Sequence, residues 1–547
     1  MIILGVSGLN EREHDTSCCL IKNNRILAFA EEERFLRIKH APGEIPFESI
    51  RYCLKQGNVS INEVDQIAIG WDYSINPYWL KNPDVFSILF PKEKILKKPK
   101  VNFYPHHISH AASSFLFSGF KESLFMVIDG QGETESISVG IANYENNVAK
   151  FKIFKKYPIN LSIGYMYDKV GEFIGLGHWS AGKLMGLSSY GKKCYELPIK
   201  LLSDGDYEID ILNEFEIGKG SLDDEEQVGE LWKKLLLSKF GKVKVGIYPN
   251  QKTKDIAFTA QRYFEIISAH IMNELVLRYP KVKKLCIAGG AALNCVNNTK
   301  LIERFGFSDL FCLPAANDAG VSLGSAALTA NENGGIFSKL KNPYLGPSYG
   351  EKEIIKVCKK YNLLYKKEKQ IERYCAVQLK KNKIIAWFQD GMEFGPRALG
   401  NRSIIASALK RENLDKINKI KKREWWRPLA PIVIEEDGEK IFPNSKKSYY
   451  MLQTFHINTK YKQKLPAIKH VDETSRPQIV KRTMNRKLYK LLSEYKKLSG
   501  VGVLINTSFN TLKNEPIVCS PEDAVRNFID SGIDFLVMQN FVITKNE

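Results

Sequence analysis

The sequence predicts an α/β protein that begins with a duplicated strand-and-hairpin unit and continues into a second α/β region. A short apolar strand, a polar loop and a hairpin occur over residues 1–30 and again over 124–154. The turn of each hairpin is an Asn-Asn pair, a residue type that tolerates the left-handed backbone of tight turns. A stretch rich in Gly, Pro, Asn and Ser at 331–350 then marks a linker between the two regions.

The expected elements of the first region follow the two hairpins in chain order. The first unit has strands Met1–Ser7, Ser17–Lys22 and Arg25–Ala30, then helix Pro46–Gly57 and strand Val64–Trp71. The second has strands Leu124–Asp129, Ser136–Ala142 and Val148–Phe154, then helix Thr259–Leu277, strands Leu285–Ala288 and Leu310–Pro314, and helix Ser322–Leu328. A duplication of this kind predicts a two-lobed nucleotide-binding architecture, as in the actin, hexokinase and Hsp70 superfamily.

Beyond the linker lies a second region with its own strand and helix patterns. These include Ile384–Phe388, Leu399–Leu409, Val501–Asn506 and the helix Pro521–Ser531. We therefore expect two domains, at 1–345 and 346–547.

Length and composition describe an ordinary globular chain with a strong positive charge. Its 547 residues are 44% hydrophobic and 26% charged, which excludes a disordered or fibrous protein. The net charge of +19 favours anionic partners, although a lysine-rich solvated surface explains it equally well. The ten cysteines are scattered without a C-x-x-C pair, which argues against a zinc ribbon or a secreted disulfide framework. No apolar stretch reaches the roughly 18 residues of a membrane helix, so we expect a cytoplasmic protein without a membrane partner.

Three histidines within five positions predict a metal site. His106 and His110 are four residues apart, so on a helix they share one face and can hold one ion, although histidines capping a polar helix start are the alternative. The remaining ligands should be carboxylates, and Asp129 and Asp318, each near the end of an expected strand, are the best candidates unless they are simple turn residues. Such a set with open positions suits iron, manganese or zinc.

Two glycine-rich segments are candidate phosphate or adenosine contacts. Gly289 and Gly290, with Asn294 close behind, allow a ligand to approach the backbone. Residues 175–192 are interpreted as a loop that offers Lys183 and several amides to a phosphate. Glycines that serve packing alone, or a plain surface loop, are the alternatives.

The second region is dense in arginine and asparagine. Guanidinium groups bind phosphate or carboxylate through a bidentate fork, so several converging arginines predict a pocket for a small, highly charged anion. The candidates are Arg397, Lys421, Arg423, Arg427, Arg476, Asn506 and Asn510. The mixed basic and aromatic residues at 421–428 are also compatible with a nucleic-acid stacking patch, and any single arginine with a surface role.

In their joint order these motifs resemble the NodU/CmcH family of O-carbamoyltransferases, over nearly the whole chain. The resemblance is carried by HDTS at 14–17, ERF at 33–35 with Lys39 and His40, HHISHAASSF at 106–115, DGQGE at 129–133, SAGKLMGLSSYG at 180–191, AGGAALN at 288–294, NDAG at 317–320, GPRALGNRSI at 395–404, REWWRPLAP at 423–431 and NTSFN at 506–510. One departure is Asn514, where the family usually has glycine before Glu-Pro. Because asparagine tolerates a left-handed backbone, we expect little effect.

The resemblance implies two domains and a two-step reaction. Residues 1–345 would form an actin-like domain of the ASKHA type, with duplicated ribonuclease-H-like halves, similar to tRNA threonylcarbamoyladenosine transferase; residues 346–547 would form a YrdC-like α/β domain. The family converts carbamoyl phosphate and ATP, with Mg²⁺, into carbamoyl adenylate and passes the carbamoyl group to a hydroxyl of a small-molecule or sugar acceptor.

The resemblance also assigns roles to the candidate residues. His106, His110, Asp129 and Asp318 would hold Fe²⁺ or a similar divalent metal. The candidates of the second region would hold carbamoyl phosphate and ATP, and His14 and Lys39 would face the transfer site. With an ordinary pKa of ~6.5, His14 is a suitable base for the acceptor hydroxyl.

Two other functions are compatible with the sequence. One is a tRNA-modifying enzyme of the threonylcarbamoyladenosine type, which the positive charge favours slightly. The other is a non-catalytic ATP-binding protein, which leaves the arginines of the second region unused. The detailed motifs favour the small-molecule branch, so nucleic acid is not an expected partner. The acceptor, the metal and the oligomeric state, a homodimer included, are left open.

Overall fold

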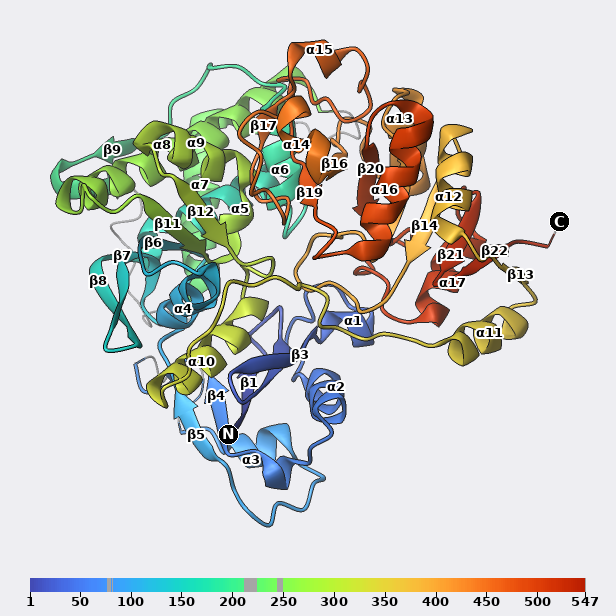
Figure 1. Ribbon diagram of the computed structural model, residues 1–547. Helices are drawn as coiled ribbons and strands as arrows, with labels where there is room; N and C mark the ends of the chain where they lie inside the picture. Colours follow the sequence, from blue (N-terminus) through green and yellow to red (C-terminus); the bar gives the residue numbers. More distant parts are fainter. Residues whose placement is uncertain (76–79, 81, 211–223, 244–248, 547) are drawn as a thin grey trace. The chain divides into compact units, whose positions relative to one another are not determined.

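The structure is a computed structural model that describes residues 1–547 except 76–79, 81, 211–223, 244–248 and 547 (Figure 1). It is an α/β protein with two compact units. Met1–Phe29 and Pro42–Leu340 make up the first unit, and Ala30–Ala41 and Lys341–Glu547 make up the second. The chain passes between the units at Leu340, within the expected linker, but the short segment Ala30–Ala41 also groups with the second unit. A single boundary at residue 345 leaves this segment in the first domain, whereas the structure groups it with the second unit.

The first unit contains two five-stranded sheets with the same strand order. The first sheet has the order β3-β2-β1-β4-β5 and the second β8-β7-β6-β11-β12. Their strands are β1 (Ile2–Ser7), β2 (Ser17–Lys22), β3 (Arg25–Glu31), β4 (Gln66–Ile69), β5 (Lys100–Phe103), β6 (Glu122–Ile128), β7 (Glu135–Glu145), β8 (Val148–Pro158), β11 (Lys284–Ala288) and β12 (Asp309–Cys312). In both sheets an antiparallel hairpin is extended by two parallel strands. The predicted internal duplication is therefore confirmed.

Each hairpin closes through the Asn-Asn pair that the sequence singles out. Asn23 and Asn24 have φ of 50° and 60°, and Asn146 and Asn147 have φ of 50° and 65°. Two consecutive left-handed residues give the type I′ turn, whose twist matches that of the flanking strands. The loops at the opposite end of each hairpin, after β1 and after β6, contain the predicted site residues His14 and Asp129.

Two helices, one against each sheet, form the middle of the first unit. Helix α10 (Ala319–Glu332) packs on β1, β2 and β4, and α4 (His106–Ser118) packs on β6, β11 and β12. The two helices also pack on each other, as Figure 1 shows. Small residues permit this approach: a Cβ on Gly324 would lie 1.9 Å from the Ser109 carbonyl oxygen. This packing brings the first turns of both helices close together.

The remaining elements of the first unit are α2 (Phe47–Gly57), α3 (Val85–Leu89), α5 (Ile163–Phe173), α6 (Ala181–Ser188), β9 (Ile199–Leu201), β10 (Tyr207–Ile209), α7 (Asp224–Phe240), α8 (Gln251–Arg278) and α9 (Cys295–Phe305). The prediction of a loop over 175–192 is wrong in part, because α6 occupies its middle. The strong helix formers Ala, Leu, Lys and Met in that stretch outweigh its glycines. Helix α8 also begins earlier than Thr259, with its start capped by the Asn250 side chain.

The second unit is built on one eight-stranded mixed sheet of order β13-β22-β21-β14-β15-β20-β16-β19. Its strands are β13 (Leu364–Lys367), β14 (Ile385–Phe388), β15 (Arg402–Ser407), β16 (Ala430–Ile434), β19 (Gln478–Val480), β20 (Val503–Ser508), β21 (Phe535–Met538) and β22 (Phe541–Thr544). Its helices are α11 (Glu351–Lys360), α12 (Ile371–Lys380), α13 (Glu412–Ile420), α14 (Glu435–Ile441), α15 (Thr459–Lys462), α16 (Arg486–Ser499) and α17 (Pro521–Ile529), and β17 (Phe455–His456) and β18 (Thr474–Ser475) pair separately. Asn514 has φ 61°, a left-handed backbone that asparagine tolerates.

Arginines anchor the segment Ala30–Ala41, which includes the short helix α1 (Glu33–Leu36), within the second unit. The fully buried Arg34 pairs with Glu31 at 2.7 Å and donates to the Gly395 carbonyl at 2.8 Å. Arg37 donates to the carbonyl oxygens of Pro516 and Ile517. These charged hydrogen bonds hold the segment within the second unit.

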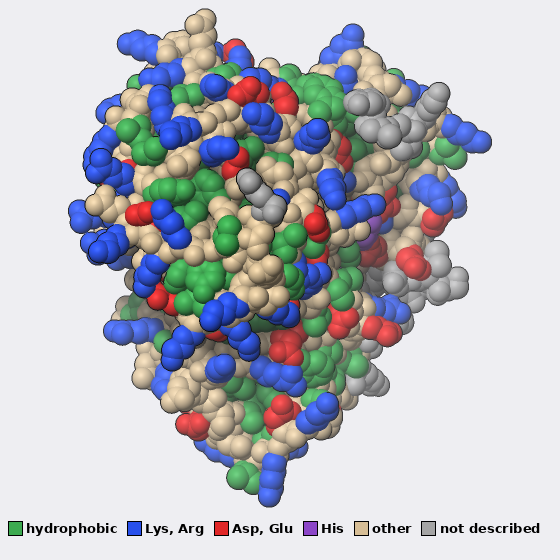
Figure 2. Space-filling model, turned by 90° about the vertical axis from the view of Figure 1, so that its right-hand side faces the viewer, with side chains coloured by type: hydrophobic (Ala, Val, Ile, Leu, Met, Phe, Trp, Pro, Cys, Tyr) green, Lys and Arg blue, Asp and Glu red, His purple; other side chains and the backbone are tan. Residues whose placement is uncertain are grey.

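Lysine and arginine side chains are spread over the face shown in Figure 2 and are interleaved with acidic ones. On this face the charges are typical of a solvated basic surface. No helix among the described residues is both long and apolar enough to cross a membrane.

Candidate functional site

The structure brings together the four predicted metal ligands in the first unit. His106 and His110 lie on the first turns of α4, Asp129 follows β6, and Asp318 immediately precedes α10. One ligand atom of each residue lies within 4.8 Å of those of the others. The helical spacing of the histidines and the strand-end positions of the aspartates were both visible in the sequence.

The ligand atoms face one another at short range. The Nε2 atoms of His106 and His110 are 3.1 Å apart, and His110 Nε2 lies 2.9 Å from Asp129 Oδ2. Asp318 Oδ1 lies 3.5 Å from His110 Nε2 and 3.8 Å from His106 Nε2. Two imidazole nitrogens and two carboxylate oxygens therefore converge on one point, a donor set that suits a divalent transition metal.

Outer contacts orient these ligands toward that point. His106 Nδ1 is 3.2 Å from the Gly70 carbonyl, which directs Nε2 into the cluster. Asp129 Oδ1 accepts the backbone N–H groups of Gly130 and Gly290, which leaves Oδ2 facing the histidines. Glu133, which sequence analysis did not single out, accepts the backbone N–H of His106 at 2.8 Å. Its place in DGQGE beside Asp129 was the available signal.

The electrostatics of the cluster call for a positive charge. Burial lowers the pKa of His106, but the hydrogen bond to Asp129 and the charge of Asp318 outweigh it and raise that pKa to about 9. Burial raises the pKa of Asp129, but its hydrogen bonds to His106 and His110 hold it well below the usual range. A bound divalent ion would place a positive charge next to the same carboxylates, in the place of the proton that they now stabilise on His106. The residues present therefore fit a divalent ion.

His14 lies beside this cluster and is held by its neighbours. Its Nδ1 is 3.1 Å from Asp15 Oδ2, and 39% of its side chain is exposed. Burial lowers its pKa, but the Asp15 hydrogen bond and the charges of Asp318 and Asp129 raise it to about 10. The expectation of an ordinary pKa is therefore wrong, because the hydrogen bond to Asp15 and the charges of Asp318 and Asp129 outweigh the effect of burial.

The loop that carries His14 is fixed by Glu13, a further residue that sequence analysis missed. Its carboxylate accepts from the Tyr73 hydroxyl and from the Asn10 amide, both at 2.6 Å. Lys39, the second residue assigned to the transfer site, belongs to the second unit, and its charge contributes to lowering the pKa of Lys421. The structure therefore places Lys39 with the basic residues of that unit.

The glycine segment after β11 supports Asp129. Gly289 has φ 89°, and a Cβ there would lie 2.2 Å from the Ile128 carbonyl oxygen. Gly290 N–H donates to Asp129 Oδ1 at 3.3 Å. Asn294 caps α9 and exchanges amide hydrogen bonds with Gln261, and Lys183 on α6 donates to the Leu176 carbonyl. These contacts give Asn294 and Lys183 structural partners within the unit.

We predict that Gly289→Ala destabilises the protein by about 2–4 kcal/mol and weakens metal retention, since both the steric clash and the left-handed φ oppose a side chain. Urea unfolding and metal analysis measure the two effects. Gly306→Ala is the control: Gly306 has φ 63° but a Cβ there meets nothing within 4 Å, so about 1 kcal/mol is expected. Equal losses in the two variants would contradict the steric argument.

In the second unit, basic side chains cluster beside the end of β20. Burial and the charges of Arg423, Arg427 and Lys39 hold the pKa of Lys421 well below its usual range. Burial and the charges of Arg427 and Arg476 do the same to Arg423. Glu424 offsets part of this repulsion, at 3.6 Å from Arg427. A group of cations that depress one another's pKa is arranged for an anion of several charges.

Asparagines and hydroxyls complete this basic cluster. Lys421 Nζ donates to Ser508 Oγ at 3.1 Å and to the Asn510 carbonyl at 3.0 Å. Asn506 Nδ2 donates to the Ala398 carbonyl, while its buried Oδ1 has no hydrogen-bond partner among the described residues. Arg397 lies on the same loop as Ala398. Of the predicted anion-binding set, Lys421 is hydrogen-bonded to Asn510. Charge interactions that lower the pKa of Lys421 or of Arg423 connect a larger group, namely Lys421, Arg423, Arg427 and Arg476.

Glu393 organises the loop that presents Arg397 and Ala398, and sequence analysis missed it. Its Oε1 accepts the backbone N–H groups of Leu399, Asn401 and Arg402 at 2.7, 3.1 and 3.2 Å. The carboxylate is fully buried. An acidic residue at the start of a Gly-Pro loop was the only signal in the sequence.

We predict that Glu393→Ala lowers the free energy of unfolding by about 3 kcal/mol, because three buried N–H groups lose a charged acceptor. Chemical denaturation measures the loss. Glu393→Gln keeps one side-chain oxygen at the same place and should lose clearly less. If both variants unfold alike, the carboxylate does not hold the loop through these bonds.

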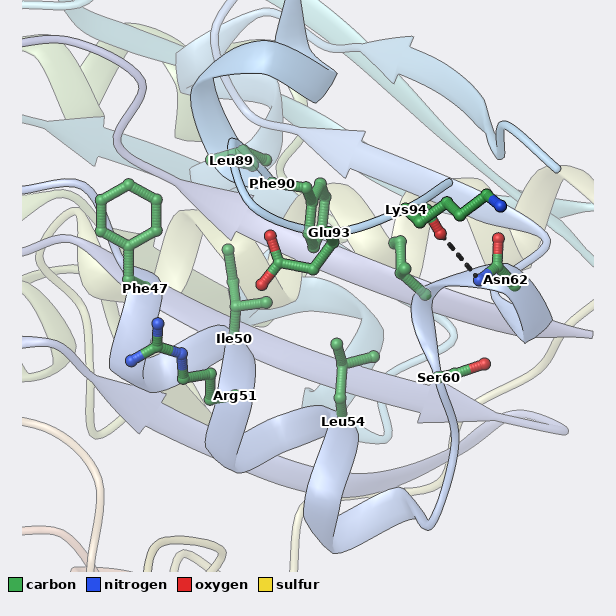
Figure 3. A pocket seen from close by; sticks show the side chains of 11 residues that line it. Phe47, Ile50, Arg51, Leu54, Ser60, Asn62, Leu89, Phe90, Glu93 and Lys94 are labelled. Carbon is green, nitrogen blue, oxygen red and sulfur yellow. Dashed lines mark hydrogen bonds between the residues drawn. The ribbon is translucent and has the colours of Figure 1, made fainter. Parts of the chain in front are cut away.

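A mainly apolar hollow of about 340 Å³ also lies in the first unit (Figure 3). Phe47, Ile50 and Leu54 of α2 line one side, and Leu89 and Phe90 line the other. At its edge the Asn62 amide donates to the Lys94 carbonyl. None of the predicted site residues lines it.

Two family models match most of this chain. The family described as carbamoyltransferase N-terminus matches residues 3–85 and 82–327, and the family described as carbamoyltransferase C-terminus matches 376–545. Nodulation protein NolNO of Sinorhizobium fredii is 32% identical over 100% of this chain and 83% of its own length. Nodulation protein NolO of Bradyrhizobium diazoefficiens is 32% identical over 80% and 78%. The solved structure of T. kodakarensis HypF covers 61% of this chain and 48% of its own at 15% identity, with a TM-score of 0.36, too slight a likeness to carry an argument.

Proposed function

Because this chain belongs to the NodU-type carbamoyltransferase family, we propose that it forms carbamoyl adenylate and transfers the carbamoyl group to an acceptor hydroxyl. In the first step, carbamoyl phosphate, ATP and water would give carbamoyl adenylate, phosphate and pyrophosphate. In the second, the acceptor oxygen would bond to the carbamoyl carbon, AMP would leave and a proton would be released.

The basic cluster of the second unit supports the first step. Carbamoyl phosphate and ATP with Mg²⁺ bring several negative charges to one place, and Lys421, Arg423 and Arg427 supply half-buried basic groups. Asn506 and Asn510 add polar groups at the end of β20. We assign this step to a YrdC-like domain at 346–547, completed by Lys39. The cluster is the observation that carries the proposal, because Glu424 offsets only part of the mutual repulsion of these cations and a bound anion would offset more.

The site of the first unit supports the second step. We assign residues 1–345 to an actin-like domain, which the duplicated sheets of identical order support. His106, His110, Asp129 and Asp318 would hold Fe²⁺ or a similar ion, which when bound supplies a Lewis acid. His14 would take the acceptor proton when a bound cation offsets Asp129 and Asp318, whose charges otherwise raise its pKa, and Asp15 would keep its imidazole oriented. A cytoplasmic location and a homodimer stay predictions.

Pyrophosphate release from ATP, with and without carbamoyl phosphate, tests the proposal. Release that depends strictly on carbamoyl phosphate is expected. Release that instead requires threonine and bicarbonate would favour a tRNA-modifying enzyme, and the absence of any release would favour a non-catalytic ATP-binding protein.

We further predict that His14→Asn slows carbamoyl transfer by about 10²–10⁴-fold, the usual contribution of a general base. Carbamoyl-phosphate-dependent pyrophosphate release should be unchanged, since His14 belongs to the first unit. Mass spectrometry of the carbamoylated acceptor measures the transfer. A full transfer rate in this variant would remove His14 from the mechanism.

A further inference from the structure

A strongly basic loop of the first unit joins α3 to β5 (Figure 1). This lysine loop, residues 91–100, has the sequence PKEKILKKPK, in which five lysines and one glutamate give a formal charge of +4. All five lysines are exposed. Lys97 Nζ lies 3.9 Å from Asp65 Oδ1, but an exposed pair of this kind offsets little charge. The loop therefore presents positive charge to whatever approaches it.

An apolar side chain stands in the middle of these lysines. Leu96 is 76% exposed, the largest exposed fraction among the large hydrophobic side chains that the structure describes. A single exposed leucine needs no explanation by itself, but this one has Lys94 before it and Lys97 and Lys98 after it. Lysines that flank an exposed apolar side chain are typical of segments that lie at a lipid–water interface.

The backbone holds Leu96 in this exposed position. Asn62 Oδ1 accepts the backbone N–H groups of Leu96 at 2.7 Å and of Lys97 at 3.3 Å. The Asn62 amide donates to the Lys94 carbonyl oxygen at 3.3 Å (Figure 3). Ile95, next to Leu96 in the chain, packs against the core of the first unit. One asparagine thus fixes a turn in which Ile95 is covered and Leu96 is not.

The apolar hollow of the first unit shares residues with this loop. Asn62, Glu93 and Lys94 belong to its lining, and Lys94 and Arg51 are exposed basic side chains at its edge (Figure 3). Its volume of about 340 Å³ is within the ~300–1,000 Å³ of ligand sites. Apolar walls with basic side chains at the edge are complementary to an acyl chain and an anionic headgroup.

We propose that the lysine loop and the adjacent hollow form a docking surface for a membrane of anionic phospholipids. The lysines meet the headgroup phosphates, Leu96 enters the boundary between headgroups and acyl chains, and the hollow receives part of one acyl chain. A nucleic acid or an acidic polypeptide chain would match the lysines but provide no apolar phase for Leu96. The argument from sequence against a membrane partner concerned spanning helices, and a peripheral contact needs none. This inference goes beyond the proposed function and does not depend on it.

Cosedimentation of the full-length protein with lipid vesicles tests the proposal. The probes are vesicles of phosphatidylcholine alone and vesicles in which phosphatidylglycerol replaces about a third of it. A DNA duplex and polyglutamate serve as polyanions without an apolar phase. We expect the protein to bind the anionic vesicles at least about 10-fold more tightly than the neutral ones, and high salt to remove most of that difference.

Neutralising three lysines of the loop should weaken binding to anionic vesicles about 100-fold, since each lysine near such a surface contributes about five-fold. The variant is Lys94→Gln/Lys97→Gln/Lys98→Gln, which keeps the backbone contacts of Asn62. Its matched control makes the same change of charge at exposed positions of α11, in Lys352→Gln/Lys356→Gln/Lys359→Gln. Vesicle binding of the control should stay within about two-fold of the wild type.

Substitutions of Leu96 test the apolar part of the contact. Leu96→Ser should weaken vesicle binding about 10-fold without lowering Tm, because the side chain is mostly exposed. Leu96→Trp should strengthen binding, and the difference in its fluorescence from the wild type should shift to shorter wavelength on vesicles, since tryptophan favours the interface. Leu277→Ser, at a position of α8 that is 66% exposed, should bind vesicles as the wild type does.

The catalytic assay is independent of this test. Without vesicles, pyrophosphate release should be the same in all of these variants as in the wild type, because none of the changed residues belongs to the proposed catalytic machinery. Three results would overturn the docking surface: equal binding to neutral and anionic vesicles, unchanged vesicle binding in the triple lysine variant of the loop, or unchanged vesicle binding in Leu96→Ser. If the same lysine variant loses affinity for DNA or polyglutamate while Leu96→Ser changes nothing, the loop binds a polyanion instead.

Discussion

His110→Ala is expected to abolish both bound metal and carbamoyl transfer. Its Nε2 lies 3.1 Å from that of His106 and 2.9 Å from Asp129 Oδ2, so the change removes the atom nearest to the other ligands. Loss of one ligand from a four-residue set should lower metal affinity and transfer by about 100-fold or more, since even a residue that only orients a ligand contributes 10- to 100-fold. Metal analysis after dialysis and an acceptor assay measure the two losses.

Two comparisons make this result specific. Carbamoyl-phosphate-dependent pyrophosphate release should persist in His110→Ala, because the basic cluster belongs to the other unit. His270 lies on α8 and its Nε2 is hydrogen-bonded to the Asp206 carbonyl oxygen. The His270→Ala variant should retain metal and transfer. A metal-replete, active His110→Ala protein would refute the metal assignment.

The second large effect is expected in the second unit, where Arg423→Met should lower carbamoyl-phosphate-dependent pyrophosphate release by about 100-fold or more. Burial and the charges of Arg427 and Arg476 lower the pKa of the Arg423 guanidinium, whose own charge lowers the pKa of Lys421. Without ligand, the loss of its hydrogen bond to Asn418 is offset by relief of that repulsion, so Tm should change by only a few degrees. With carbamoyl phosphate, the stabilisation that binding gives the wild type should be lost.

Arg411→Met serves as the matched control for this variant. Arg411 is exposed, and its contact is a long hydrogen bond to the Pro466 carbonyl, so activity and ligand-induced stabilisation should both be retained. Full activity in Arg423→Met would contradict an anion-binding role. So would a fall in Tm relative to the wild type that is the same without carbamoyl phosphate as with it.

Local patterns were sufficient for much of the fold and for part of the site. The Asn-Asn turns and alternating apolar strands predicted both hairpins of the first unit, because a two-residue turn and its strands are determined by residues close in the chain. The i, i+4 spacing of His106 and His110 likewise needs only one helix. Asp129 and Asp318 were found because each follows a strand on a recognisable turn.

Local sequence patterns were therefore enough to predict the duplicated architecture, the two regions and the residue types of both centres. Only the tertiary structure placed Lys39 with Lys421, gave His14 the carboxylates that raise its pKa, used Glu393 to hold three amides and used Asn62 to hold Leu96 at the surface. Each of these depends on groups brought close through space, and electrostatic and steric interactions act over a few ångströms whatever the separation along the chain.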